Sequence, residues 1–324
     1  MGLSQRNARP CIRIYNLVMS LALLTHPACS RHDPGSGHPE SPARLAAVLD
    51  ALRDPRFAQI ESIEAPRATR EQLARVHVEA LVEDVLDRDP GDGLHRLDPD
   101  TLMSTGSAEA AVRAAGAVCA AIDAVMEGHV DHAFCAIRPP GHHATADTAM
   151  GFCLFNNVAV GAAHALAAHG LERVAIVDFD VHHGNGTQDI FWSDARVLYA
   201  SSHQYPLYPG SGAADERGAG NIVNAPLAPG AGSAEFREAC EHIILPALDA
   251  FEPQLVLISA GFDAHRLDPL AGLDLEAEDY AWITERLVEV AERHAKGRVV
   301  SSLEGGYSLE ALRVSTAAHV AALL

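Results

Sequence analysis

Short apolar runs alternate with longer amphipathic stretches over most of this chain. Five runs are apolar almost throughout, and they lie at 133–137, 174–177, 197–200, 255–259 and 299–303. Stretches with apolar residues at helical spacing separate them, at 156–169, 233–250, 276–295 and 308–324. Strands that are apolar on both faces are typical of parallel sheets covered by helices on both sides. The alternation therefore predicts an α/β fold with a central, mainly parallel sheet.

The same patterns predict one strand and three helices in the first third of the chain. Residues 20–25 fit a first buried strand, and helices are expected over 41–52, 70–86 and 107–128, the last ending at a glycine suited to a helix C-terminus. The polar segments 30–42 and 88–106 are expected to be loops. We find no internal repeat and no linker, so a single domain is expected.

Three arginines precede an apolar run over residues 17–24, which gives a superficial likeness to a signal peptide. The run is short and no small-x-small cleavage site follows it, so we reject that interpretation. Met19 is an alternative start, which would leave residues 1–18 as an extension to a catalytic domain over 19–324. No stretch approaches the ~20 apolar residues of a membrane span. Six scattered cysteines without a CxxC pair are typical of reduced thiols, so we expect a cytoplasmic protein.

The chain is strongly acidic. Its 324 residues include 43 Asp and Glu against 24 Lys and Arg, a net charge of −19. No segment gathers basic residues into a phosphate-binding surface, so direct contact with nucleic acid is not expected. The acidic surface favours a cationic substrate or a basic partner, although solubility alone is the simpler explanation. A homo-oligomer is left open.

Polar residues follow four of the apolar runs at the point where each run ends. The segments are RPPGHH (138–143), DFDVHHGNG (178–186), AGFD (260–263) and EGGY (304–307). In an open parallel sheet the active site lies beyond the carboxyl ends of the strands. We therefore expect these four segments to meet at one edge of the sheet.

The second and third of these segments predict a metal site. Asp180 and His182 are two residues apart, so an extended backbone points both toward one ion. Asp263 completes an Asp/His/Asp set that leaves coordination positions open, as in a catalytic zinc site. The same donors also permit Fe(II) or Mn(II). The alternative is a polar loop whose aspartates only cap turns, and the neighbouring histidines and glycines argue against it.

The other two segments predict acid–base chemistry. His142 and His143 follow two prolines and a glycine, in a turn that would hold two imidazoles side by side. One can take a proton from water while the other stays charged or protonates a leaving amine. Asp178 and Asn185 are the candidates to orient them. Tyr307 can donate its phenolic hydrogen to an oxyanion, so these residues together predict a hydrolytic centre.

The segments RPPGHHA, DFDVHHGNGTQ, SAGFDAH..DPL and LEGGY resemble the histone deacetylase superfamily. The resemblance is strongest to its class II and bacterial deacetylase-like branch, which has acetylpolyamine amidohydrolases among its relatives. It covers the chain from about residue 20 onward and includes HPESPAR at 38–44. It implies an arginase-like α/β domain, a Zn²⁺ bound by Asp180, His182 and Asp263, and hydrolysis of N-acyl amides.

The resemblance also implies roles for the remaining residues of the site. His142 and His143 become the tandem catalytic pair, with His143 as the general base, and Tyr307 polarises the carbonyl. Asp178 is the implied partner of His142. Asn185 is the implied partner of His143, as in class II, where class I has an aspartate.

Further implied positions surround the zinc. Gly151, Phe152 and Tyr208 would line a tunnel for the acylated chain, with Tyr208 in place of a more usual phenylalanine. Arg44 matches a residue on an internal channel through which acetate leaves. The resemblance also implies a structural K⁺ held at Asp178, Asp180, His182, Ser201 and Ser202.

The implied substrate is an acylated lysine in a protein or peptide, and an acetylated polyamine is the alternative. Polyamine-selective eukaryotic relatives carry a glutamate gatekeeper after the DP motif, where this chain has Leu270. A ureohydrolase with two manganese ions would need more Asp and His ligands than residues 178–183 supply. A catalytically inactive acyl-lysine binding module would typically have lost a ligand or Tyr307, and all are present.

Overall fold

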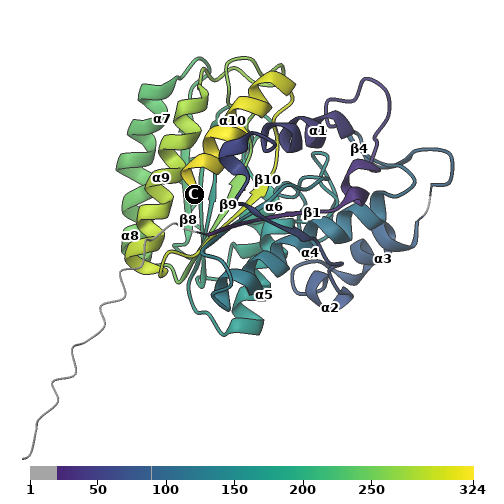
Figure 1. Cartoon of the computed structure of the whole chain (residues 1–324), viewed down its shortest axis with the longest axis horizontal. Helices are drawn as coiled ribbons and strands as arrows, with labels where there is room; N and C mark the ends of the chain where they lie inside the picture. The colour runs from purple at the N-terminus through teal and green to yellow at the C-terminus, as the bar shows by residue number, and fades with distance from the viewer. Residues whose placement is uncertain (1–19, 89) are drawn as a thin grey trace, which may run out of the picture.

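The computed structural model describes residues 20–88 and 90–324 (Figure 1). Within them, one parallel sheet has the strand order β2-β1-β5-β10-β9-β6-β7-β8. Its strands are β1 (Leu21–Thr25), β2 (Glu61–Glu64), β5 (His132–Cys135), β6 (Val174–Asp178), β7 (Val197–Gln204), β8 (Ile222–Leu227), β9 (Leu255–Ala260) and β10 (Val299–Leu303). The α/β class and the parallel sheet predicted from the sequence are confirmed.

Burial explains which strands the sequence reveals. Every residue of β5, β6, β7, β9 and β10 is buried, and these five correspond to the five apolar runs. The two edge strands were not predicted. β2 is mostly exposed, and β8 contains an asparagine and a proline. An edge strand has one sheet neighbour and does not need a continuous apolar sequence.

Helices cover both faces of the sheet, as Figure 1 shows. On one face α4 (Ser107–Met126) packs against α5 (Asn157–His169), and on the other α10 (Leu309–Ala322) packs between α1 (Pro42–Ala51) and α9 (Ala277–His294). The predicted helix over 233–250 is α7 (Ser233–Ala239) and α8 (Leu245–Phe251), joined by a π-helical turn at Cys240–Ile244. None of the helices in the described part has the length and apolarity to cross a membrane.

The single helix predicted over 70–86 is wrong. The structure has α2 (Arg70–Leu73) and α3 (Glu79–Asp87) instead. Between them the buried His77 donates from Nδ1 to the Thr145 carbonyl at 2.9 Å and accepts the Asn156 backbone N–H at 2.9 Å. The helix breaks because this long-range contact satisfies both ring nitrogens.

One segment expected as a loop contains regular structure, and one helix was not predicted. Residues 88–106 include a hairpin of β3 (His95–Asp98) and β4 (Thr101–Met103), and HHGNGTQ runs into α6 (Asn185–Phe191). Both elements lie beside the site described next. The predicted extension over residues 1–18, and the alternative start at Met19, lie outside the described residues.

Candidate active site

The carboxyl ends of β5, β6, β9 and β10 bring the predicted site residues together at one edge of the sheet. His142 and His143 follow β5, Asp178 ends β6, and Asp263 follows β9. The segments are also bonded to one another. The Val181 N–H donates to Asp263 Oδ1 at 2.8 Å, which fixes the segment that carries Asp180 and His182 against the segment after β9.

Asp180, His182 and Asp263 converge on one point. His182 Nδ1 lies 3.2 Å from Asp180 Oδ1 and 3.2 Å from Asp263 Oδ2, and one ligand atom of each residue lies within 4.8 Å of the others. Two glycines make this convergence possible. A Cβ on Gly305 would lie 2.5 Å from Asp180 Oδ2, and one on Gly261 would overlap the Asp180 carboxylate.

The electrostatics of this cluster fit a divalent cation. Burial, followed by the charge of Asp180, raises the pKa of Asp263 to about 7. Among the described residues no lysine or arginine forms an ion pair with either carboxylate; their ion-pair contacts are with histidines. Two buried, adjacent negative charges are unfavourable without a compensating cation. Three oxygen and nitrogen donors, with positions left open, suit a catalytic zinc.

The two histidines have different partners. His142 donates from Nδ1 to Asp178 Oδ2 at 2.9 Å, and His143 donates from Nδ1 to Asn185 Oδ1 at 2.8 Å. Their ring centroids are 4.0 Å apart. Because Nδ1 of each ring faces an acceptor, Nε2 of His143 is left to accept a proton.

The surroundings of the two imidazoles also shift their pKa values in opposite directions. Burial opposes a charge on His142, but the carboxylates of Asp180 and Asp178 outweigh it and raise its pKa well above the usual value. Burial and the charges of His142 and His182 lower the pKa of His143. These opposite shifts favour a charge on His142 and a free base at His143, which is the division needed for acid–base catalysis.

A narrow pocket of about 190 Å³ opens above these groups. It is lined by Asp100, His143, Gly151, Phe152, His182, Tyr208, Leu270 and Tyr307. The rings of Phe152 and Tyr307 meet edge to face at 5.8 Å, and those of Tyr208 and His143 at 5.1 Å. The pocket is therefore a slot with aromatic walls that ends at the histidines.

The hairpin β3–β4 shapes one wall of this slot. Phe152 has a φ of +68°, which is uncommon for a residue with a side chain. Its N–H donates to Thr101 Oγ1 at 3.0 Å, and the Gly151 N–H donates to Asp100 Oδ1 at 3.1 Å. Sequence reasoning missed Asp100 and Thr101, whose only signal was a polar DPDT stretch.

Tyr307 is held from behind by buried polar groups. Its N–H donates to Asp268 Oδ2 at 2.7 Å, and the Arg44 guanidinium lies 4.9 Å from its ring centroid. Arg44 also donates to the Gly306 carbonyl at 2.6 Å. Glu304, whose role the sequence did not reveal, accepts the N–H groups of Gly141 and His142 at 2.6 and 3.1 Å and thereby fixes the histidine turn.

The residues expected to hold potassium are adjacent in the sheet. Asp178 and Ser201 are register partners on β6 and β7, and Ser202, the next residue of β7, is buried as well. Neighbouring residues of a strand point to opposite faces. The two serine hydroxyls therefore do not face one ion together.

A second Asp/His group lies between α4 and α5, away from the slot. Asp123 Oδ1 accepts from Nε2 of His164 at 2.8 Å and from Nε2 of His169 at 2.7 Å. Arg75 faces His164 Nδ1 at 3.1 Å. Because arginine can only donate, the His164 proton must sit on Nε2. In the structure these three side chains are therefore joined as a hydrogen-bond cluster.

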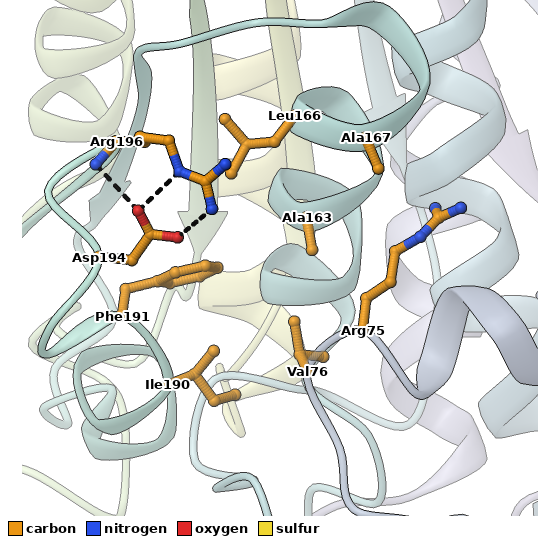
Figure 2. Close-up of a pocket in the computed structure, with 9 residues that line it drawn as sticks. All are labelled: Arg75, Val76, Ala163, Leu166, Ala167, Ile190, Phe191, Asp194 and Arg196. Atoms are coloured by element: carbon orange, nitrogen blue, oxygen red, sulfur yellow. Dashed lines mark hydrogen bonds and ion pairs between the residues drawn. The ribbon is translucent and has the colours of Figure 1, made fainter.

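Another cavity, of about 300 Å³, lies beside α5 and α6 (Figure 2). Apolar side chains from Val76, Ala163, Leu166, Ala167, Ile190 and Phe191 line most of it. Its charged groups are already paired, since Arg196 donates to Asp194 at 2.6 and 2.9 Å and Arg75 bonds Glu71. Unlike the slot, it has no histidine and no group of converging carboxylates in its lining.

Comparison with known proteins agrees with this geometry. The histone deacetylase domain family matches residues 38–323. A probable deacetylase of Archaeoglobus fulgidus is 40% identical over 299 residues, which cover 90% of this chain and 82% of that protein. A histone deacetylase-like amidohydrolase of Pseudomonas aeruginosa is 44% identical over 282 residues, covering 84% and 73%. The crystal structure of the HDA15 HD domain superposes with a TM-score of 0.89 at 38% identity, over 94% of this chain and 89% of that one. The resemblance read from the motifs is confirmed: this chain belongs to the histone deacetylase family.

Proposed function

We propose that the protein is a zinc-dependent deacylase that hydrolyses the side-chain amide of an N-acyl lysine. One observation carries this proposal. Two adjacent histidines with different hydrogen-bond partners lie beside three converging candidate metal donors, at the end of an aromatic slot. Membership of the deacetylase family supports a hydrolase. The metal and the substrate are our inference from the donors and the shape of the slot.

The chain's own groups supply each proton transfer. Zn²⁺ held by Asp180, His182 and Asp263 would polarise the amide carbonyl and lower the pKa of water. His143 Nε2, unprotonated at neutral pH, accepts the proton of the attacking water. The hydrogen bond to Asn185 holds that nitrogen toward the slot.

Charge that develops on the carbonyl oxygen requires a donor. Burial raises the pKa of Tyr307 well above its usual value, so its hydroxyl stays protonated and donates to the oxyanion. The proton accepted by His143 is then delivered to the nitrogen of the leaving amine as the C–N bond breaks. Asp178 keeps His142 charged, which stabilises negative charge nearby.

The slot favours an extended aliphatic chain. Phe152 and Tyr208 present aromatic surface on its walls, and Leu270 adds an apolar group. The four methylenes of lysine fit such a passage. A single acidic residue, Asp100, also lines the slot, and it is the observation that favours an acetylated polyamine as the second candidate.

The first experiment tests the reaction itself. The purified protein should contain about one zinc per chain and release the fluorophore from an acetyl-lysine or trifluoroacetyl-lysine peptide. A hydroxamate chelator and the variant Asp180→Ala should each abolish turnover. Activity that survives both would overturn the assignment, and tight peptide binding without turnover would identify an inactive acyl-lysine binding module.

The second experiment tests the substrate. Rates are compared for acetyl-lysine peptides, longer acyl-lysines, acetylputrescine and acetylspermidine. We expect the lysine peptides to have the higher kcat/KM. A polyamine advantage above tenfold, about 1.4 kcal/mol of transition-state preference, would assign the polyamine reaction instead.

Two smaller parts of the proposal concern K⁺ and location. Asp178 and Ser201 are adjacent, and we infer that Ser202 would contribute its carbonyl rather than its hydroxyl to a bound K⁺. Replacing K⁺ by Na⁺ in the buffer should then lower the melting temperature.

The five described cysteines are free, which supports a location in the reducing cytoplasm.

A further inference from the structure

One wall of the slot is formed by a loop whose position is fixed by residues outside the slot. Tyr208 lies on the segment 205–216 between β7 and β8, and its ring faces His143 and His182 at centroid distances of 5.1 and 6.4 Å. No hydrogen bond fixes its hydroxyl among the residues that the structure describes. The position of Tyr208 therefore depends on how the loop backbone is anchored.

The anchor is the carboxylate of Glu216. It accepts the N–H of Ala213 at 3.0 Å and the N–H of Gly212 at 3.2 Å, so it closes the loop on itself. It also accepts Gln188 Nε2 at 2.5 Å, which ties the loop to α6. Glu216 is thus bonded both to the loop that carries Tyr208 and to the helix that begins with Asn185.

The carboxylate of Glu216 determines which groups donate and which accept in the hydrogen bonds that follow. Because Glu216 only accepts, Gln188 must turn its amide N–H₂ toward it and its oxygen away. That oxygen accepts Asn224 Nδ2 at 2.8 Å and His183 Nε2 at 3.1 Å. His183 Nδ1 in turn accepts the Ser211 hydroxyl at 2.8 Å.

The result is a closed ring of hydrogen bonds. It starts at Glu216, passes through Gln188 and His183, and returns to the loop at Ser211. Each member of the ring is at least partly buried, and the loop residue Gly212 is buried with them. A Cβ on Gly212 would lie 2.7 Å from the His183 ring, so the loop and the metal-binding segment are in close contact.

We propose that Glu216 is a positioning residue for the substrate slot, which sets the place of Tyr208 through this ring and so determines how tightly the acyl-lysine chain is held. Only the expected kinetic effect of this inference rests on the proposed function. Glu216 touches neither the metal donors nor the two catalytic histidines, so it acts on binding rather than on the chemical step.

The variant Glu216→Gln tests this with little change of shape. A carboxamide has one nitrogen, and both oxygens of the native carboxylate face donors. Whichever way the new amide turns, its N–H₂ group meets a donor, and at least one bond to the loop or to Gln188 is lost. We expect KM for an acetyl-lysine peptide to rise about tenfold while kcat stays within about threefold, since charge-assisted bonds to a carboxylate are the strong ones.

The neighbouring Asp215→Asn is the matched control. Asp215 is exposed, and this change removes the same charge one residue away, so it should leave KM unchanged. The double variant Glu216→Gln/Tyr208→Ala should show no further rise in KM beyond Tyr208→Ala alone, because the effect passes through Tyr208. Additive effects, or equal losses in kcat for both acidic variants, would overturn the proposal.

Hydrogen–deuterium exchange gives a reading that does not need activity. The Gly212 and Ala213 amides should exchange at least tenfold faster in Glu216→Gln than in wild type or Asp215→Asn, with the sheet strands unchanged. Unchanged exchange in this loop would refute the positioning role. If the wild-type protein shows no deacylase activity, the proposed function fails, and the exchange experiment still decides whether Glu216 anchors the loop.

Discussion

The variant Gly151→Ala should distinguish the effect of backbone strain from the effect of displacing His143, the proposed general base. Gly151 has a φ of +58°, and a Cβ there would lie 2.7 Å from Cγ of the buried His143 ring and closer still to Cδ2. Ordinary carbon contacts need about 3.5 Å or more, so the imidazole must move by roughly 1 Å. A misplacement of that size costs about 100-fold in rate, or about 2.7 kcal/mol of transition-state stabilisation.

Gly170→Ala supplies the control. Gly170 ends α5 with a similar φ of +63°, but a Cβ there meets nothing within 4 Å. Both variants carry the left-handed penalty of about 1–2 kcal/mol, and only Gly151→Ala also disturbs His143.

Urea unfolding and steady-state kinetics on an acetyl-lysine peptide measure the two effects separately. We expect both variants to lose stability and only Gly151→Ala to lose kcat/KM, by about 100-fold. The reasoning is refuted if Gly151→Ala keeps kcat/KM within threefold of wild type, or if Gly170→Ala loses as much.

Three further predictions concern charge. Asp263→Asn should reduce bound zinc to well below one per chain, measured by elemental analysis, and dialysis against a chelator should lower the wild-type melting temperature until Zn²⁺ is restored. Asn185→Asp should raise the pKa of His143 by placing a carboxylate beside Nδ1, so the acid limb of the pH profile of kcat/KM should move to higher pH; an unmoved limb would contradict the role of His143 as base. Burial lowers the pKa of His77 from 6.5 to about 4, so the unfolded state takes up the proton first and stability falls as pH drops from above 6.5 toward 4. Between pH 7.5 and 5 the wild type should lose about 2 kcal/mol more than His77→Gln, measured by urea unfolding, and equal losses would refute this.

The parts of the fold that the sequence predicts are those set by local burial. β5, β6, β9 and β10 are enclosed on both faces, so their residues must be apolar, and the polar residues at their ends stand out. The topology of a parallel sheet then brings those ends together without further information. This is why His142 and Asp263, about 120 residues apart in the chain, could be expected at one site.

The parts that the sequence does not predict depend on distant partners. The break at His77 exists because the ring bonds the loop near Thr145, and no local pattern signals that contact. The left-handed backbone at Phe152 requires Thr101, which lies in a segment that reads as an ordinary polar loop. The ring around Glu216 likewise joins two segments, 183–188 and 211–216, and no local pattern signals the bonds between them.

The strand order has a consequence for how the molecule folds. β10, the last strand of the chain, lies between β5 and β9 at the middle of the sheet. Without β10, the strands on either side would form two separate groups with open edges, and such edges invite aggregation. The histidine pair follows a strand of one group and the three candidate metal donors follow strands of the other, so the site can form only when β10 joins the two groups. Folding should accordingly be slow, as the long sequence separation of these pairings requires.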